Sequence, residues 1–117
     1  MTVTRDVSPN FKVARVRSPG HLSHLRTLPC SIFGCFDQLI EAHHLTCSPD
    51  RKARGLKAGD NWGVPLCRFH HRALHQAGAE SKWWTEQGIA PVPLAEFLWR
   101  TSPANPDRLP DAISALF

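Results

Sequence analysis

Histidine and cysteine residues gather in two short stretches of this 117-residue chain. The stretches are His43-His44 and residues 67–75, which read Cys-Arg-Phe-His-His-Arg-Ala-Leu-His, and together they hold five of the seven histidines. Cys30 and Cys35 stand just upstream. Thiolate and imidazole groups are the ligands that zinc and related metals prefer in proteins. The sequence therefore predicts metal binding, with one closed structural site and one open reactive site.

The second stretch can supply both sites if it forms a helix. His71 and His75 are four residues apart, so they would lie on one face and could share an ion. Cys67 and His70 are three residues apart, which is the spacing of a zinc half-site. Because neighbouring helical residues point about 100° apart, His70 and His71 would face different sites. With the upstream cysteines, the predicted closed site consists of Cys30, Cys35, Cys67 and His70.

Composition favours a small domain that depends on metal. Ten prolines and no tyrosine, with irregular apolar spacing, argue against a long regular sheet or helical bundle, so a structural metal would contribute much of the stability. The formal charge of +4 and the pI of about 9.2 suit an anionic partner such as nucleic acid.

Nothing in the sequence indicates a membrane span or a secretory signal. No apolar run reaches the roughly 18 residues that a span requires, and residues 1–10 lack an apolar signal core. We therefore expect a cytoplasmic protein of a bacterial or phage-infected cell, with no membrane partner and with thiolates that bind metal rather than form disulfides. Cys47 is left over as a loop thiol or as an alternative to Cys35 in the zinc site.

Three elements are expected to position the metal ligands. An apolar run predicts a strand over residues 37–44 that delivers the paired histidines. A second strand, over residues 61–66, leads directly into Cys67. The helix then covers residues 68–77 and ends near Gly78, since glycine is the common helix-ending residue.

A helix is also expected near the N-terminus. Ser18 followed by Pro19 forms an acceptable N-cap and first position for a helix over residues 21–27. On this helix we expect His21 and His24 to lie at the surface.

Two further helices are expected after the metal-bearing one. Residues 80–87 should form the first, with Trp83 and Trp84 packed against the metal-bearing helix. Two prolines then interrupt the chain before a short amphipathic helix over residues 94–100.

Basic residues cluster in two places that could contact phosphate. One is the N-terminal arm, with Lys12, Arg15 and Arg17; the other is the polar segment over residues 46–60. The second segment is either a solvated loop or a phosphate contact that tracks a nucleic-acid backbone. Its candidate nucleic-acid-binding residues are Arg51, Lys52, Arg54 and Lys57.

These motifs give the chain a family resemblance. Ala42-His43-His44, then residues 65–75 (Pro-Leu-Cys-x-x-His-His-x-x-x-His), then a Glu-x-x-Trp-Trp motif at residues 80–84, resemble the HNH, or His-Me finger, nucleases of phages and prophages. The resemblance covers roughly residues 20–100. It implies an α+β fold, with a small zinc-stabilised ββα-metal core and flanking short helices. The expected organisation is a basic N-terminal arm (1–20), an HNH-type nuclease domain (21–100) and an extended C-terminal tail (101–117).

The resemblance also implies roles for the remaining site residues. His43, His71 and His75 would bind a catalytic metal, and His44 would be the general base. Asn61 would orient that base, with Asp60 beside it as the alternative. The four residues of the closed site would hold a structural zinc.

The implied activity is metal-dependent hydrolysis of phosphodiester bonds in DNA by an endonuclease. A neutral imidazole can deprotonate water at neutral pH, and a dication stabilises the charge of the transition state. The single catalytic ion could be Mg²⁺, Mn²⁺, Ni²⁺ or Zn²⁺, and the oligomeric state is open. Adjacent histidines on a regular strand point to opposite sides, so a shared site requires a local distortion near His44. The alternative function is a non-catalytic, zinc-stabilised DNA-binding module.

Overall fold

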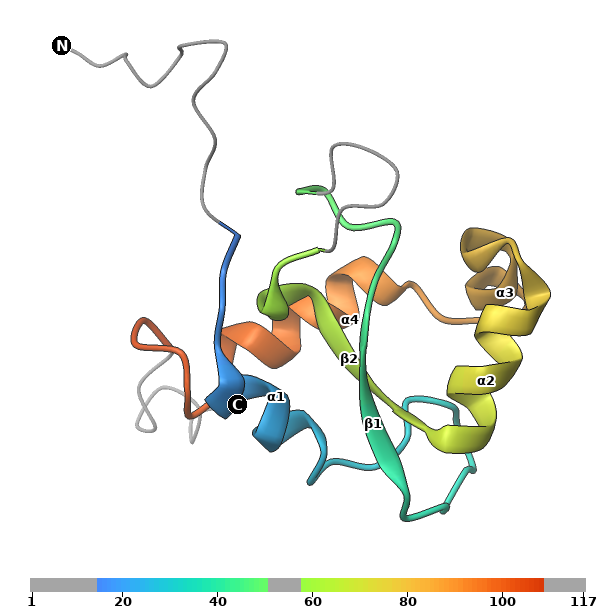
Figure 1. Cartoon of the computed structure of the whole chain (residues 1–117), viewed down its shortest axis with the longest axis horizontal. Helices are drawn as coiled ribbons and strands as arrows, with labels where there is room; N and C mark the ends of the chain where they lie inside the picture. Colours follow the sequence, from blue (N-terminus) through green and yellow to red (C-terminus); the bar gives the residue numbers. More distant parts are fainter. Residues whose placement is uncertain (1–14, 51–57, 109–117) are drawn as a thin grey trace, which may run out of the picture.

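The computed structural model describes residues 15–50 and 58–108 of the chain. Within this part the protein is a small α+β structure with four α-helices and a two-stranded antiparallel sheet, which confirms the predicted class (Figure 1). In chain order the elements are α1 (Pro19–Leu25), β1 (Ile40–His44), the 3-10 turn η2 (Asp60–Trp62), β2 (Gly63–Cys67), α2 (Arg68–Ala77), α3 (Glu80–Glu86) and α4 (Pro91–Arg100).

The two strands pair residue for residue and carry the ligands at their ends. The register runs from Ile40 opposite Cys67 to His44 opposite Gly63, with no extra residue in either strand. The second strand starts at Gly63 rather than at residue 61, because residues 60–62 close a 3-10 turn before it. Helix α2 follows β2 without a loop, so the metal-bearing helix starts where the sheet ends.

Helix α2 forms over the residues that the sequence predicts. Its first turn is capped by the Cys67 sulfur, which accepts a hydrogen bond from the His70 N–H. It ends at Gly78, whose φ of 79° lies in the left-handed region that glycine adopts without strain. A predicted metal ligand therefore doubles as the helix cap.

Helix α1 has the predicted Ser18 cap and Pro19 first position, but it covers residues 19–25 rather than 21–27, and one of its histidines is buried. Ser18 accepts a hydrogen bond from the His21 N–H, and Pro19 occupies the first turn. The prediction that His21 lies at the surface is wrong: the residue is 0 % exposed. Its ring packs edge-on against Trp99 at 5.0 Å, and its Nδ1 lies 2.8 Å from Ser102 Oγ.

The C-terminal part of the described chain also differs from the prediction. Helix α4 begins at Pro91, three residues earlier than expected, since proline in a first turn has no N–H that needs a partner. After α4 the chain turns repeatedly over residues 101–108 instead of extending. Ser102 and Asn105 are buried there, and the Asn105 side chain donates to the Trp99 carbonyl.

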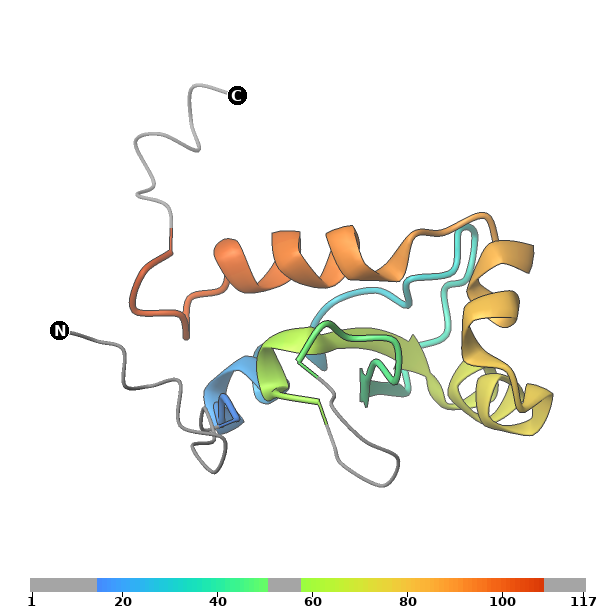
Figure 2. The same ribbon diagram turned by 90° about the horizontal axis from the view of Figure 1, so that it is seen from above.

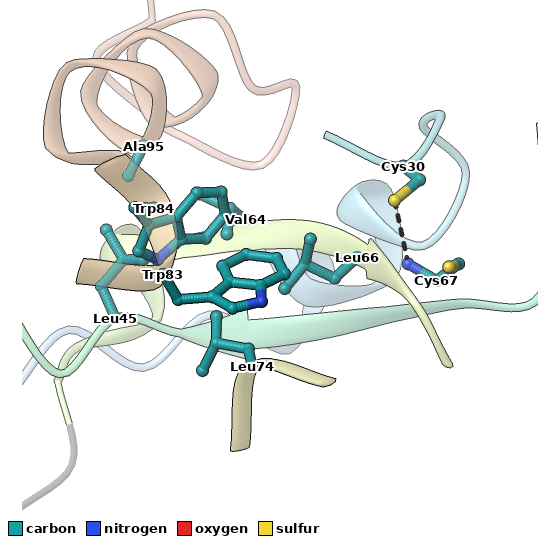
Figure 3. Packing of buried hydrophobic residues seen from close by; sticks show 9 residues of the cluster. All are labelled: Cys30, Leu45, Val64, Leu66, Cys67, Leu74, Trp83, Trp84 and Ala95. Carbon is teal, nitrogen blue, oxygen red and sulfur yellow. Dashed lines mark hydrogen bonds between the residues drawn. The ribbon is translucent and has the colours of Figure 1, made fainter. Parts of the chain in front are cut away.

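The core lies between the sheet and helices α2, α3 and α4 (Figures 2 and 3). Trp83 and Trp84 contact each other edge-on at 5.0 Å and are both buried in this core, as the sequence predicts for the pair. Leu45, Val64, Leu66, Leu74 and Ala95 surround them. The core reaches Cys30 and Cys67, so the closed metal site continues the apolar packing at one end. No helix in residues 15–50 and 58–108 has the length and apolar character needed to cross a bilayer.

Candidate metal centres

The four predicted ligands of the closed site lie together. Cys35 Sγ is 3.8 Å from Cys67 Sγ. His70 Nδ1 is 3.2 Å from Cys67 Sγ and 3.7 Å from Cys30 Sγ. A tetrahedral zinc with ordinary bond lengths separates its sulfur and nitrogen ligands by about 3.5–3.8 Å. The four groups therefore have the composition and spacing that hold a metal ion such as zinc.

Hydrogen bonds to the backbone hold the four residues of this site in place without a bound ion. The Cys67 N–H donates to Cys30 Sγ at 3.3 Å, and such donors stabilise thiolate charge. Ser31 attaches the cysteine loop to β2, because its N–H and its hydroxyl both donate to the Pro65 carbonyl. Burial raises the pKa of the Cys67 thiol to about 11, so a thiolate at this position requires a neighbouring cation. Cys47 lies outside the set.

Three imidazoles form the second group. His43 Nδ1 is 3.1 Å from His71 Nε2, which is 3.2 Å from His75 Nε2. Tetrahedral nitrogen ligands of zinc lie about 3.3 Å apart. His43 comes from β1 and the other two from one face of α2, as the spacing predicts. This group too could hold a metal ion, and with three protein ligands it would leave a coordination position open.

Carboxylates hold two of these rings and determine which nitrogen faces inward. His43 Nε2 lies 2.9 Å from Glu80, and His71 Nδ1 lies 2.8 Å from Glu41. Both carboxylates have lowered pKa values and only accept hydrogen bonds, so the protons sit on these outer nitrogens. The inner nitrogens, His43 Nδ1 and His71 Nε2, then face each other at 3.1 Å, an arrangement that a shared cation or proton stabilises.

Glu80 is the more strongly bound of the two carboxylates. Burial alone would raise its pKa, but hydrogen bonds from His43, Thr46 and Trp84 outweigh burial and lower the pKa to about 2. The Trp84 indole N–H donates at 2.9 Å, and the Thr46 hydroxyl at 2.7 Å. Glu80 thereby links the His43 ring by hydrogen bonds to Trp84, a residue of the hydrophobic core.

His44 lies on the other face of β1. The strand is regular here, so the expected distortion near His44 does not occur, and the two histidines point to opposite sides. His44 Nε2 lies 2.8 Å from Asp60 Oδ1, so Asp60, rather than Asn61, is the hydrogen-bond partner of this ring. Asn61 Oδ1 is buried and has no hydrogen-bond partner among the described residues.

Asp60 is ionised in this arrangement. Burial raises its pKa, but the hydrogen bonds from His44 and from the Ser18 N–H more than offset this effect, so its pKa lies below the ordinary value. The carboxylate thus accepts a hydrogen bond from the His44 Nε2–H, which leaves Nδ1 as the ring nitrogen with the lone pair. The His44 side chain is 23 % exposed, so solvent reaches this pair.

A hollow of about 420 Å³ opens beside the three-histidine group. It is lined by Glu41, Arg68, His71, Arg72 and His75. Arg68 lies 3.5 Å from Glu41, and both side chains are well exposed. The hollow therefore brings two guanidinium groups next to the imidazoles, a combination suited to an anion.

Most of the remaining predicted contacts fall outside the described residues. The nucleic-acid candidates at positions 51, 52, 54 and 57, and Lys12 in the arm, fall outside the described residues. Of the arm residues that are described, Arg15 donates to the Ala58 carbonyl at 3.0 Å, and Arg17 is exposed.

One comparison with known proteins identifies a family. Residues 9–102 match the family described as "Protein of unknown function (DUF968)". The chain belongs to the DUF968 family. No curated protein and no solved structure matches it. Both groups of candidate metal ligands lie inside the matched segment, residues 9–102.

Sequence reasoning missed the residues that support the ligands. Glu41, Glu80, Arg68 and Arg72 were not singled out as site residues. A local signal existed for two of them, since Arg68 and Arg72 share the face of α2 that carries His71 and His75. Glu80 lies 37 residues from its partner His43, and no local pattern indicates such a contact.

Proposed function

We propose that this protein is a metal-dependent DNA endonuclease of the HNH type, with a structural zinc in the Cys30, Cys35, Cys67 and His70 group. The observation that carries the proposal is the three-histidine group beside a hollow with two arginines. A purely structural zinc protein needs one complete ligand set, and the second set is surplus to it. Two antiparallel strands followed by α2, with ligands on β1 and α2, also follow the order expected of a ββα-metal core.

The hollow suits a phosphodiester substrate. Arg68 and Arg72 attract the phosphate, and Arg recognises such anions through paired N–H donors. A divalent ion bound by His43, His71 and His75 would supply open positions for a phosphate oxygen and stabilise negative charge as it develops. The proposed substrate is DNA, and phosphate contacts of this kind carry no sequence preference.

His44 is the proposed general base. Its Nε2 proton is held by Asp60, so Nδ1 can accept a proton from the attacking water. Among the described residues β1 pairs only with β2, so a phosphodiester lying across the other edge of β1 would contact both the His43 face and the His44 face. In this proposal Asp60 is the positioning residue that holds the ring in one tautomer.

Cleavage of supercoiled plasmid with Mg²⁺, Mn²⁺, Ni²⁺ or Zn²⁺ tests this function. We expect nicked or linear product with at least one ion, and a rate for His44→Ala that is lower by about 10²–10⁴-fold. His24→Ala, on the half-buried face of α1, is the matched control and should cleave like wild type. Intact plasmid with every ion would contradict the proposal, and full activity of His44→Ala would remove His44 from the mechanism.

The second candidate, a non-catalytic zinc-stabilised DNA-binding module, rests on the closed site alone. Metal content distinguishes the two functions. One tightly bound zinc per chain indicates the module, whereas one tight zinc with one exchangeable ion indicates the nuclease.

A further inference from the structure

Large aromatic side chains lie at the surface around the closed metal site. Phe33 is 101 % exposed, Phe36 is 89 % exposed and Phe69 is 68 % exposed. Leu39, which follows Phe36 by three residues, is 58 % exposed. Such side chains in contact with water contribute nothing to the core, and a patch of them usually marks a binding surface.

The metal site determines where these phenylalanines lie. Phe33 sits in the loop closed by the two cysteines, and Phe36 directly follows Cys35, whose sulfur is 3.8 Å from that of Cys67. Phe69 is two residues beyond Cys67, on the first turn of α2. The Arg68 N–H donates to the Leu39 carbonyl at 2.9 Å, which joins the segment after the loop to the start of α2.

The periodicity of α2 connects this patch to the open site. At about 100° per residue, Arg72 lies between the His71 and His75 side of the helix and Phe69. Arg68 lies on the same side as the two histidines. Around the helix the order is therefore imidazoles, then guanidinium groups, then an exposed aromatic ring. Phe69 also contacts the His70 ring edge-on at 5.2 Å, which limits its orientations.

We infer that Phe33, Phe36 and Phe69 form a stacking surface for the bases of unpaired nucleic acid, whose phosphates contact Arg68 and Arg72. Proteins that bind single strands combine cationic groups along the backbone with aromatic rings on which bases stack. Bases inside a duplex do not expose their faces, so the surface selects single-stranded or locally opened DNA. This inference rests on the proposed function and names its substrate class.

Charge favours nucleic acid over a second copy of the chain as the occupant. The protein carries +4 overall, and the two arginines border the patch. Two acidic side chains lie near the patch: Asp37, whose Oδ1 accepts the Leu39 N–H, and Glu41, which lies 3.5 Å from Arg68 and leaves Arg72 without a carboxylate partner among the described ion pairs. A second copy would bring the same positive charge to the same place.

Binding of a labelled oligothymidylate of about 12 nucleotides, followed by fluorescence anisotropy, tests the inference. The zinc-loaded full chain is compared on this strand and on a duplex of equal length. We expect tighter binding to the single strand, with Phe36→Ala and Phe33→Ala each weakening it by about fivefold or more. Phe97→Ala is the matched control, since Phe97 is 52 % exposed on α4, outside the patch.

Phe36→Leu separates stacking from general apolar contact. Leucine keeps apolar area but has no aromatic face, so this variant should bind almost as weakly as Phe36→Ala. Zinc content and melting temperature should remain those of wild type in every variant, because the replaced rings are exposed.

Three results would overturn the inference. They are equal affinities for Phe36→Ala and Phe97→Ala, a preference for duplex, and a dimer in sedimentation that Phe36→Ala dissociates without a change in oligonucleotide affinity. The last result would assign the patch to self-association. A protein that binds the strand as expected but cuts no DNA with any ion would keep this inference and refute the proposed nuclease.

Discussion

Glu80 provides the sharpest test of how the open site is supported. Its carboxylate accepts hydrogen bonds from His43 Nε2 at 2.9 Å and from Trp84 Nε1 at 2.9 Å. The N–H and the hydroxyl of Thr46 add two more, at 3.2 and 2.7 Å. The Glu80 side chain is only 7 % exposed. Replacement by alanine removes the acceptor of all four donors at once.

The cost follows from which donors are buried. His43 is 2 % exposed and Trp84 is 1 % exposed, so water does not replace Glu80 at either group. A buried donor without a partner costs about 1–3 kcal/mol, so two donors give a loss of about 4 kcal/mol for Glu80→Ala. Thr46 is exposed and can bond to water. Glu80→Gln keeps one carbonyl acceptor but loses the charge, for a loss of about 2 kcal/mol.

Denaturant unfolding of the zinc-loaded protein measures these losses. Glu86→Ala is the control on the same helix: the Glu86 side chain is 57 % exposed and lies 3.5 Å from the exposed surface residue Lys82. It should change the free energy of unfolding by less than about 0.5 kcal/mol. Calorimetry with Zn²⁺ or Ni²⁺ should show affinity for the exchangeable ion lowered about 10–100-fold in Glu80→Gln. Equal stability of Glu80→Ala and Glu86→Ala would refute the reasoning.

Three further predictions concern the metal sites and pH. Cys67→Ala should lose bound zinc and most folded structure by circular dichroism, because zinc-binding energy is folding energy in such domains, while Cys47→Ala keeps both. His75→Ala should weaken the exchangeable ion in calorimetry but retain the structural zinc, and excess metal should partly restore activity. Burial lowers the pKa of His21 from 6.5 to about 4, so its contribution to stability is complete above pH 6.5 and is lost as pH falls towards 4. Between pH 7 and 5 wild type should lose about 2 kcal/mol more than His21→Gln, and equal losses in urea unfolding would contradict a buried neutral histidine.

Local signals made the ligand-bearing part of the fold predictable. Helix α2 was predicted from the four-residue spacing of His71 and His75 and from Gly78 at its end, and the structure has the same bounds. The Ser18 cap was predicted on similar grounds, and the burial of the tryptophan pair was predicted from the usual preference of large aromatic side chains for the core. Spacing within a helix and residues at helix ends are properties of short segments, so they do not depend on the rest of the chain.

Contacts between distant segments were not predictable in the same way. His21 is buried because Ser102, 81 residues away, turns back beside it, and a histidine on a short amphipathic helix otherwise belongs at the surface. Glu41 and Glu80 were missed for a related reason, since a carboxylate becomes a ring-holding group only when folding brings it to the outer nitrogen of a ligand. The start of α4 was placed too late because proline was read as a helix breaker. Proline breaks a helix in its interior, but it is tolerated in the first turn, where Pro91 lies.

The paired histidines show how strand geometry constrains a mechanism. Sharing one site through their side chains requires a distortion, and the regular pairing of His43 with Val64 and of His44 with Gly63 excludes it in the described strand. Each ring instead has its own carboxylate, Glu80 for the buried His43 and Asp60 for the solvent-accessible His44. A group that binds a metal benefits from burial and fixed orientation, whereas a group that exchanges protons with water needs access to solvent. The alternation of a regular strand therefore supplies both environments from adjacent residues, and a substrate that uses both must cross the strand edge.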